Sequence, residues 1–180
     1  MKPAKISRRS LPKSSLGAAA VTGFPALVPA TVFGPTPPNS QINVGAIGVG
    51  RISRGHDLPG IWKYDSARIT AVCDVDSNRV EEAKTLVNGY YAKTKGRPYT
   101  GVTGYHNYHE LLANKDIDAV VISTPDHQHA IVAVDPVRAN KDVYLQKPAS
   151  LTIAEGRFLS NAVQASGRIL QVGSQQRSWK

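Results

Sequence analysis

The feature that most constrains the fold is a regular alternation of short apolar runs with amphipathic stretches, which begins at Ile42. The runs are rich in valine and isoleucine and are apolar on successive residues rather than on every second one. Such runs are typical of strands buried on both faces, as in a parallel sheet covered by helices. The predicted strands span residues 42–48, 68–74, 117–124, 142–146 and 168–173.

The stretches between these runs predict helices. They span about 52–63, 77–92, 107–114, 127–140 and 152–166. In the second, Asp76 or Ser77 can cap the first turn, and apolar residues recur on one face. Pro136 removes a backbone donor inside the fourth, so we expect that helix to be kinked or shortened. Residues 96–107 predict a loop, with a short weak strand at 102–105.

Strands and helices that alternate in this way require right-handed crossovers between parallel strands. We therefore predict an α/β fold of the Rossmann type, a doubly wound parallel sheet with helices on both faces in three layers, αβα. The 180 residues, 41% of them hydrophobic, suffice for one core but not for two full-sized domains. We place this predicted domain at residues 42–174.

The first 30 residues predict an export signal. A basic start is followed by a short stretch of small and apolar residues that is too short and too interrupted for a membrane span of about 20 helical residues. The segment 7–11, SRRSL, resembles the twin-arginine signal, with Leu11 where phenylalanine is usual. We predict a signal peptide at 1–30, a flexible leader at 31–41, and a periplasmic or secreted protein exported by the twin-arginine machinery.

The net charge of +9 does not indicate a nucleic-acid partner. Five of the 22 basic residues lie in residues 1–30, where there is no acidic residue, so the remainder carries 17 basic against 13 acidic residues without a basic stripe interleaved with aromatics. The single Cys73 excludes an internal disulfide and a cysteine-based zinc site. His106 and His109 flank a predicted helix cap at Asn107, and we expect solvated side chains there rather than metal ligands.

The turn after the first strand carries a phosphate-binding pattern. Residues 48–53, GVGRIS, match G-x-G-x-x-G with serine in place of the third glycine, and they lie directly between a predicted strand and a predicted helix. Gly48 permits the tight turn, and Gly50 lets the backbone approach a pyrophosphate. The helix start at Arg51 and Ile52 offers unpaired N–H groups to the same phosphates. The segment therefore predicts dinucleotide binding.

Asp74 ends the second predicted strand, 21 residues after Ser53. A carboxylate there can accept hydrogen bonds from both hydroxyls of an adenosine ribose, and it would repel the 2′-phosphate of NADP. The alternative is a helix-capping aspartate, a role for which Asp76 competes. Arg79 is the residue that could meet a 2′-phosphate instead. The predicted cofactor is NAD, with NADP possible.

Three segments together resemble one family. GAIGVGRISRGH, IDAVVISTPDHQHA and KDVYLQKPASLTIAEG are similar, in order and spacing, to the Gfo/Idh/MocA group of sugar and cyclitol oxidoreductases. The resemblance covers residues 42–180. It implies the transfer of a hydride between a sugar or cyclitol hydroxyl and a nicotinamide cofactor.

The resemblance also implies positions around the cofactor. Thr124, Pro125 and His129 match the turn that lines its nicotinamide half. Gln146, Lys147 and Pro148 match the family's Glu-Lys-Pro motif, whose lysine lies beside the nicotinamide and the substrate. Residues 173–177 resemble the crossing towards the substrate domain. The candidate site residues in that crossing are Gln176 and Arg177.

Lys147 is the candidate catalytic residue. It follows a predicted strand, and ligands of open α/β sheets bind outside the carboxyl ends of the strands. Its ammonium can polarise a sugar hydroxyl and favour the alkoxide that develops as hydride leaves. Gln146 is the departure from the family pattern, because it removes a carboxylate that would be a charge partner of the lysine. The alternative for Lys147 is a lysine directed into solvent.

Members of the family continue with a larger α/β domain that forms the substrate pocket. We expect residues 175–180 to be the start of the crossing to that domain, and this chain to be a fragment or truncated product with little or no turnover by itself. The full-length parent is expected to form a homo-oligomer. Two other functions stay open: a glycosidase that oxidises and reduces its sugar with bound NAD, and a non-catalytic dinucleotide-binding protein.

Overall fold

The computed structural model describes residues 40–178. The predicted signal peptide and residues 31–39 of the predicted leader lie outside this part of the chain. Within it, no helix has the length and the apolar character needed to cross a membrane.

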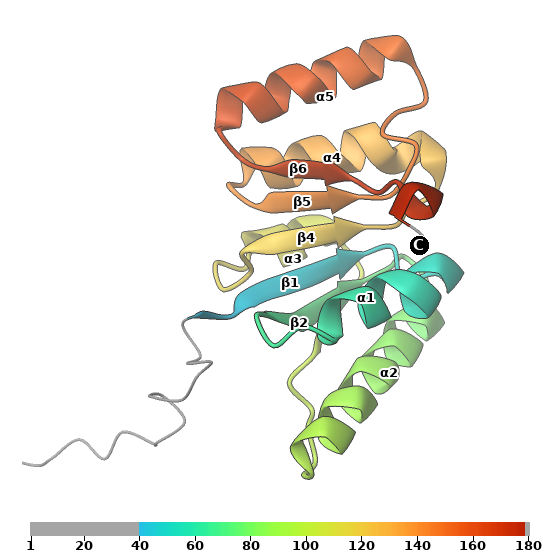
Figure 1. Cartoon of the computed structure of the whole chain (residues 1–180), viewed down its shortest axis with the longest axis vertical. Helices are drawn as coiled ribbons and strands as arrows, with labels where there is room; N and C mark the ends of the chain where they lie inside the picture. Colours follow the sequence, from blue (N-terminus) through green and yellow to red (C-terminus); the bar gives the residue numbers. More distant parts are fainter. Residues whose placement is uncertain (1–39, 179–180) are drawn as a thin grey trace, which may run out of the picture.

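The core of the fold is a six-stranded sheet in which every neighbouring pair of strands is parallel (Figure 1). The strand order is β3-β2-β1-β4-β5-β6, so the chain starts in the middle, winds out to one edge, returns beside β1 and winds out to the other. The predicted Rossmann-type fold is confirmed. The strands are β1 Ile42–Ile47, β2 Ala67–Cys73, β3 Thr103–Tyr105, β4 Ala119–Ile122, β5 Asp142–Leu145 and β6 Leu170–Val172.

The helices lie between the strands as predicted, with one irregularity in the first. There a π-helix precedes a short α-helix. The elements are η3 Ser53–Asp57, α1 Leu58–Trp62, α2 Ser77–Lys95, α3 Tyr108–Ala113, η4 Asp126–Gln128, α4 His129–Arg138, α5 Ile153–Ser166 and η5 Gln175–Ser178.

Local sequence signals set the ends of the longer helices. The Asp76 side chain accepts the backbone N–H of Asn78 at the start of α2, and Gly96 ends that helix at a φ of 62°. Helix α4 includes Pro136 but is shorter than predicted, because residues 126–128 form a 3₁₀ turn and the α-helix ends at Arg138.

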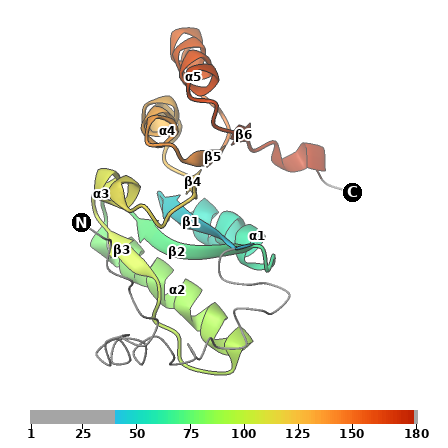
Figure 2. The same cartoon turned by 90° about the vertical axis from the view of Figure 1, so that its left-hand side faces the viewer.

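Helices cover the two faces of the sheet unequally. Helices α1 and α2 pack on one face, and α3, α4 and α5 on the other, and each face has its own cluster of buried apolar side chains. Figure 2 shows α4 and α5 on one side of the sheet and α1 on the other. Within residues 40–178, no helix lies over β5 and β6 on the side of α1.

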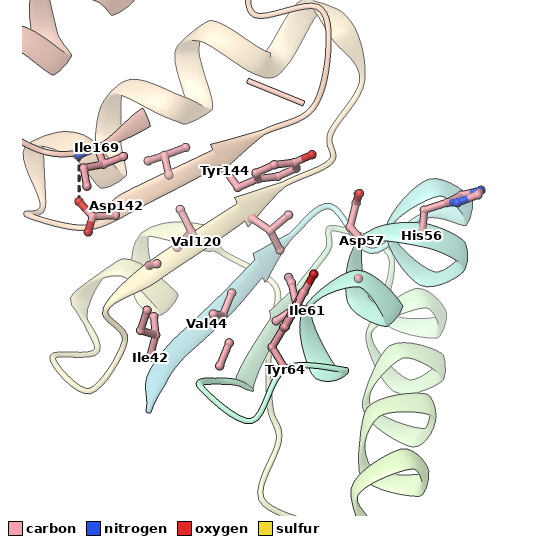
Figure 3. A pocket seen from close by; sticks show the side chains of 15 residues that line it. Ile42, Val44, His56, Asp57, Ile61, Tyr64, Val120, Asp142, Tyr144 and Ile169 are labelled. Atoms are coloured by element: carbon pink, nitrogen blue, oxygen red, sulfur yellow. Dashed lines mark hydrogen bonds between the residues drawn. The ribbon is translucent and has the colours of Figure 1, made fainter. Parts of the chain in front are cut away.

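The uncovered face forms an open apolar groove of about 470 Å³ beside α1 (Figure 3). Tyr144 of β5 is 41% exposed and Ile169, just before β6, is 69% exposed. The prediction that both of these strands are buried on both faces was therefore wrong. Their outward residues on this side have no helix of the described chain to pack against.

Candidate functional site

A second cavity, of about 580 Å³, opens at the carboxyl ends of β1, β2 and β4. Seven of its 16 lining residues were predicted from the sequence as cofactor residues. The predicted cofactor residues that line it are Gly48, Gly50, Arg51, Ile52, Asp74, Thr124 and Pro125. Lining residues that sequence reasoning did not assign include Val75, His106, Tyr108 and Gln128. They reach the cavity from loops and helix starts that carry no recognisable pattern.

The two glycines of the turn, Gly48 and Gly50, have different structural roles. Gly48 has a φ of 80°, and a Cβ atom there would lie 2.8 Å from the carbonyl carbon of Ser123 and 2.8 Å from the nitrogen of Thr124. Gly48 is therefore required by the packing of β1 against β4. At Gly50 the nearest atom to an added Cβ is Nη1 of Arg79, at 3.9 Å. The space in front of Gly50 is open to the cavity.

Asp74 ties the glycine turn to the end of β2. It is 8% exposed, its Oδ2 accepts the N–H of Val49 at 2.9 Å, and its Oδ1 accepts the N–H of Asp76 at 3.1 Å. A carboxylate has about four acceptor positions, so two remain for the hydroxyls of a ribose. The ribose-binding role of Asp74 stays a prediction, and the structure adds a second role in shaping the turn.

The thiol beside Asp74 is not a nucleophile at neutral pH. Cys73 is buried, and burial raises its pKa to about 12, with the negative charge of Asp74 acting in the same direction. A thiolate is the reactive form of cysteine. The cavity wall at Cys73 is therefore a neutral apolar surface.

Ser53 occupies the third position of the glycine pattern. Its side chain is 1% exposed and lies at the start of η3, and its small volume permits the close packing of this helix on the sheet. The serine that replaces the third glycine of the pattern is therefore small enough for that packing. Arg54, the next residue, forms an ion pair with Glu82 of α2 and donates its backbone N–H to the Gly50 oxygen at 3.1 Å.

His129 is one of the predicted cofactor residues whose side chains do not line the cavity. The ring is 1% exposed and does not line the cavity. Its Nδ1 lies 2.5 Å from the carbonyl oxygen of Pro148, and its Nε2 lies 2.8 Å from that of Thr124. The ring joins the loop after β4 to the loop after β5, so it acts on the cavity through Thr124 rather than by contact.

Lys147 follows β5 and is exposed. Its backbone N–H points to Oε1 of Gln146 at 3.4 Å, and the Lys147–Pro148 peptide bond is cis. Within residues 40–178, its ammonium has no hydrogen bond or ion pair. The position therefore leaves the ammonium available to a ligand, and its catalytic role stays a prediction.

The remaining predicted residues follow the carboxyl ends of β5 and β6. Gln146 is buried and does not line the cavity. Gln176 and Arg177 belong to η5, which follows β6, and the side chain of Gln176 lies outside the described part of the structure. No group of three or more histidine, cysteine, aspartate or glutamate side chains in the described residues could hold a metal ion.

Sequence reasoning missed a buried carboxylate that contacts residues after β4 and β5. Asp57, at the end of η3, is 9% exposed. Its Oδ2 accepts the hydroxyl of Ser123 at 2.6 Å, and its Oδ1 accepts Nε2 of Gln146 at 2.6 Å. Three segments far apart in the sequence thus meet at one charged side chain.

The site combines a strand–turn–helix start, an open glycine and an acidic residue at the end of β2. This is the geometry of a dinucleotide site, and comparison with known proteins agrees with it. Residues 42–174 match the family model Gfo/Idh/MocA, described as an oxidoreductase family with an NAD-binding Rossmann fold. The chain belongs to this family. The resemblance stated from three sequence segments is confirmed.

Two relatives of the chain have names that give different reactions. Inositol 2-dehydrogenase of Salmonella typhimurium is 30% identical over 137 residues, which are 76% of this chain and 38% of that protein. A glycosyl hydrolase family 109 protein of Shewanella pealeana is 35% identical over 156 residues, covering 84% of this chain and 32% of that protein.

A solved structure has the same fold. The WlbA dehydrogenase from Bordetella pertussis, in complex with NADH and UDP-GlcNAcA, superimposes with a TM-score of 0.67 at 25% identity, over 77% of this chain and 39% of that one. The present chain thus spans less than two fifths of the length of each of these three proteins.

Proposed function

We propose that residues 42–174 are the dinucleotide-binding domain of a longer, exported oxidoreductase that transfers a hydride between a sugar or cyclitol hydroxyl and a nicotinamide ring. The observation that carries this proposal is the cavity beside Gly50, where the backbone is open to a ligand and Asp74 stands at the end of β2. The names of the relatives support it, since they include an inositol dehydrogenase and a dehydrogenase solved with NADH.

The residues of the cavity fit a dinucleotide. The open face of Gly50 and the helix start at Arg51 and Ile52 suit the pyrophosphate, and the free acceptor positions of Asp74 suit the ribose hydroxyls. We propose NAD as the preferred cofactor because the Asp74 carboxylate would repel a 2′-phosphate. Arg79 lines the same cavity, but its Nε lies 3.5 Å from Asp76 Oδ2 in an ion pair.

Bound NAD would supply the hydride acceptor, and Lys147 would act on the substrate. An ammonium that donates a hydrogen bond to the reacting hydroxyl stabilises the negative charge that grows on the oxygen as hydride leaves. Thr124 and Pro125, which line the cavity, would place the nicotinamide end of the cofactor. His129 fixes their loop by its contact with the Thr124 oxygen.

A second function is favoured by one comparison. The family 109 glycosyl hydrolase matches more of this chain than the inositol dehydrogenase does, at higher identity. A glycosidase of this kind would use NAD transiently, to oxidise a sugar hydroxyl so that elimination cleaves the glycosidic bond. Assays of a full-length parent separate the two: net NADH formed from a free sugar or cyclitol supports the dehydrogenase, and glycoside cleavage without net NADH supports the glycosidase.

Calorimetric titration of this chain with NADH and with NADPH tests the cofactor assignment. We expect saturable binding of NADH and several-fold weaker binding of NADPH. If circular dichroism shows that the protein is folded and it binds neither NADH nor NADPH, the dinucleotide site is refuted. Tighter binding of NADPH would refute only the role given to Asp74.

Export by the twin-arginine route has a test of its own. Residues 1–41 fused to a fluorescent protein that folds in the cytoplasm should carry it to the periplasm of a bacterial host. The double variant Arg8→Lys, Arg9→Lys keeps the charge but removes the paired arginines, and it should leave the fluorescence in the cytoplasm. Equal export of both fusions would contradict the twin-arginine assignment.

A further inference from the structure

The buried carboxylate of Asp57 connects the first helix to the ends of β4 and β5. It receives one hydrogen bond from Ser123 and one from Gln146, each of 2.6 Å. Figure 3 shows Asp57 at the right-hand end of the groove, on the ribbon of the first helix, with its carboxylate on the side of Tyr144. Hydrogen bonds to an ionised group are the stronger ones, and a buried carboxylate requires them.

The amide of Gln146 can take only one orientation here. Its Nε2 donates to Asp57, and this leaves Oε1 facing the backbone N–H of Lys147, at 3.4 Å. A reversed amide would set an oxygen against the carboxylate and an NH₂ group against the N–H of Lys147. Asp57 therefore fixes the direction of Gln146, and Gln146 presents an acceptor to Lys147.

The surroundings give this arrangement little room to change. A Cβ atom added to Gly173 would lie 2.8 Å from Oη of Tyr144 and 3.5 Å from Oε1 of Gln146, so the end of β6 packs directly on the network. Burial raises the pKa of Tyr144, and the negative charge of Asp57 raises it further. Tyr144 thus stands beside the carboxylate as a neutral phenol.

The network also gives a physical reason for glutamine at position 146. A glutamate there would place a second carboxylate 2.6 Å from Asp57, at a separation where two carboxylates cannot both be ionised. Glutamine supplies the N–H donors that the Asp57 carboxylate needs.

We propose that Asp57 is a positioning residue that acts through Gln146 on the backbone of Lys147, and so sets where the Lys147 ammonium meets the nicotinamide end of the cofactor. The inference rests on the proposed function for the role of Lys147. The hydrogen-bond chain from Asp57 to Gln146 to Lys147 is independent of that function.

The first experiment is a double-mutant cycle of Asp57→Asn and Lys147→Met, read as NADH affinity. Asparagine has the same size but no charge, so its amide oxygen offers Gln146 only a neutral acceptor and the hydrogen bond is weaker. Coupled residues show interaction energies that simple additivity does not, so we expect Asp57→Asn to weaken NADH binding about fivefold with Lys147 present and less than twofold with Lys147→Met. Equal losses in both backgrounds would mean that Asp57 does not act through Lys147.

The second experiment exchanges donor and acceptor. In the double variant Asp57→Asn, Gln146→Glu, the asparagine amide can donate to the glutamate, and the other glutamate oxygen can still accept the N–H of Lys147. Gln146→Glu alone should weaken NADH binding at least as much as Asp57→Asn, and the exchange should restore most of the affinity. A double variant no better than the single ones would overturn the proposal.

The third measurement needs no cofactor. Hydrogen exchange of the Lys147 backbone amide should be faster in Asp57→Asn than in the wild type. It should be slow again in the double variant Asp57→Asn, Gln146→Glu. Asp65→Asn is the matched control, since its exposed side chain has no hydrogen bond or ion pair within residues 40–178. If the wild type binds no NADH, the proposed function fails and this test still stands. An unchanged Lys147 amide refutes the network while NADH binding stands.

Discussion

Gly50→Ala should weaken dinucleotide binding without loss of stability. The nearest atom to the added Cβ is Nη1 of Arg79, at 3.9 Å, and Gly50 is outside the left-handed φ range. Alanine that replaces glycine in a compatible conformation stabilises a protein by about 0.4–1 kcal/mol. The free energy of unfolding should therefore be unchanged or slightly higher. The methyl group fills the space that the pyrophosphate needs, and we expect NADH affinity to fall at least about tenfold, or about 1.4 kcal/mol.

Gly48→Ala is the matched contrast in the same turn. A left-handed alanine costs about 1–2 kcal/mol, and overpacking against atoms that cannot move costs about 1–3 kcal/mol more. Both apply, because the φ of Gly48 is 80° and the added Cβ would lie 2.8 Å from backbone atoms of Ser123 and Thr124. The expected loss of stability is about 2–5 kcal/mol.

Urea unfolding followed by circular dichroism measures the stabilities, and calorimetry with NADH measures binding at a temperature where each variant is folded. The reasoning is refuted if Gly50→Ala binds NADH within twofold of the wild type. It is equally refuted if Gly50→Ala loses more than about 2 kcal/mol of stability. Most losses of stability that large have a steric or polar cause, and neither cause is present at this position. A Gly48→Ala variant as stable as the wild type would contradict the packing of β1 on β4.

Three further predictions follow from single side chains. Asp74→Ser should weaken NADH about tenfold and reduce the preference over NADPH, as calorimetry would show, because it removes the charge that disfavours a 2′-phosphate. Lys141→Met should lower the free energy of unfolding in urea by about 1–3 kcal/mol, since the buried Nζ donates to the carbonyls of Asn114 and Ile117; Lys141→Arg should lose less. Burial raises the pKa of Cys73 to about 12, so the folded chain keeps a proton that the unfolded chain loses above about 9. Stability is therefore full below that pH and falls as pH rises towards 12, by up to about 1.4 kcal/mol per pH unit, and Cys73→Ala should remove this part of the slope.

The alternation of apolar runs was enough to predict the sheet. The strands begin and end within about two residues of the predicted limits, because valine and isoleucine runs between turn residues have few other stable places in a globular protein. The weak strand expected at 102–105 is present as β3, Thr103–Tyr105. The pattern could not show which faces are covered. A residue such as Tyr144 gives the same sequence pattern whether or not a helix packs on its side chain.

The candidate site was predictable where a local pattern carries the chemistry. Gly48, Gly50 and Asp74 were predicted from the strand–turn–helix pattern, and all three line the cavity. His129 shows the limit of this approach. The sequence placed His129 correctly after β4 but could not give the direction of its side chain. In the structure the ring faces two backbone carbonyls and not the cavity.

Asp57 could not be found by any local pattern, yet the sequence held an indirect sign of it. Gln146 in place of glutamate was interpreted as the loss of a charge partner for Lys147. In the structure a carboxylate is present, but it stands on the first helix and the glutamine amide lies between it and the lysine backbone. Restoring glutamate at 146 would therefore not recreate the family's usual site, because the new charge would face Asp57. At a buried position such as 146, a departure from a motif is best explained by the side chain that contacts it, which here is Asp57.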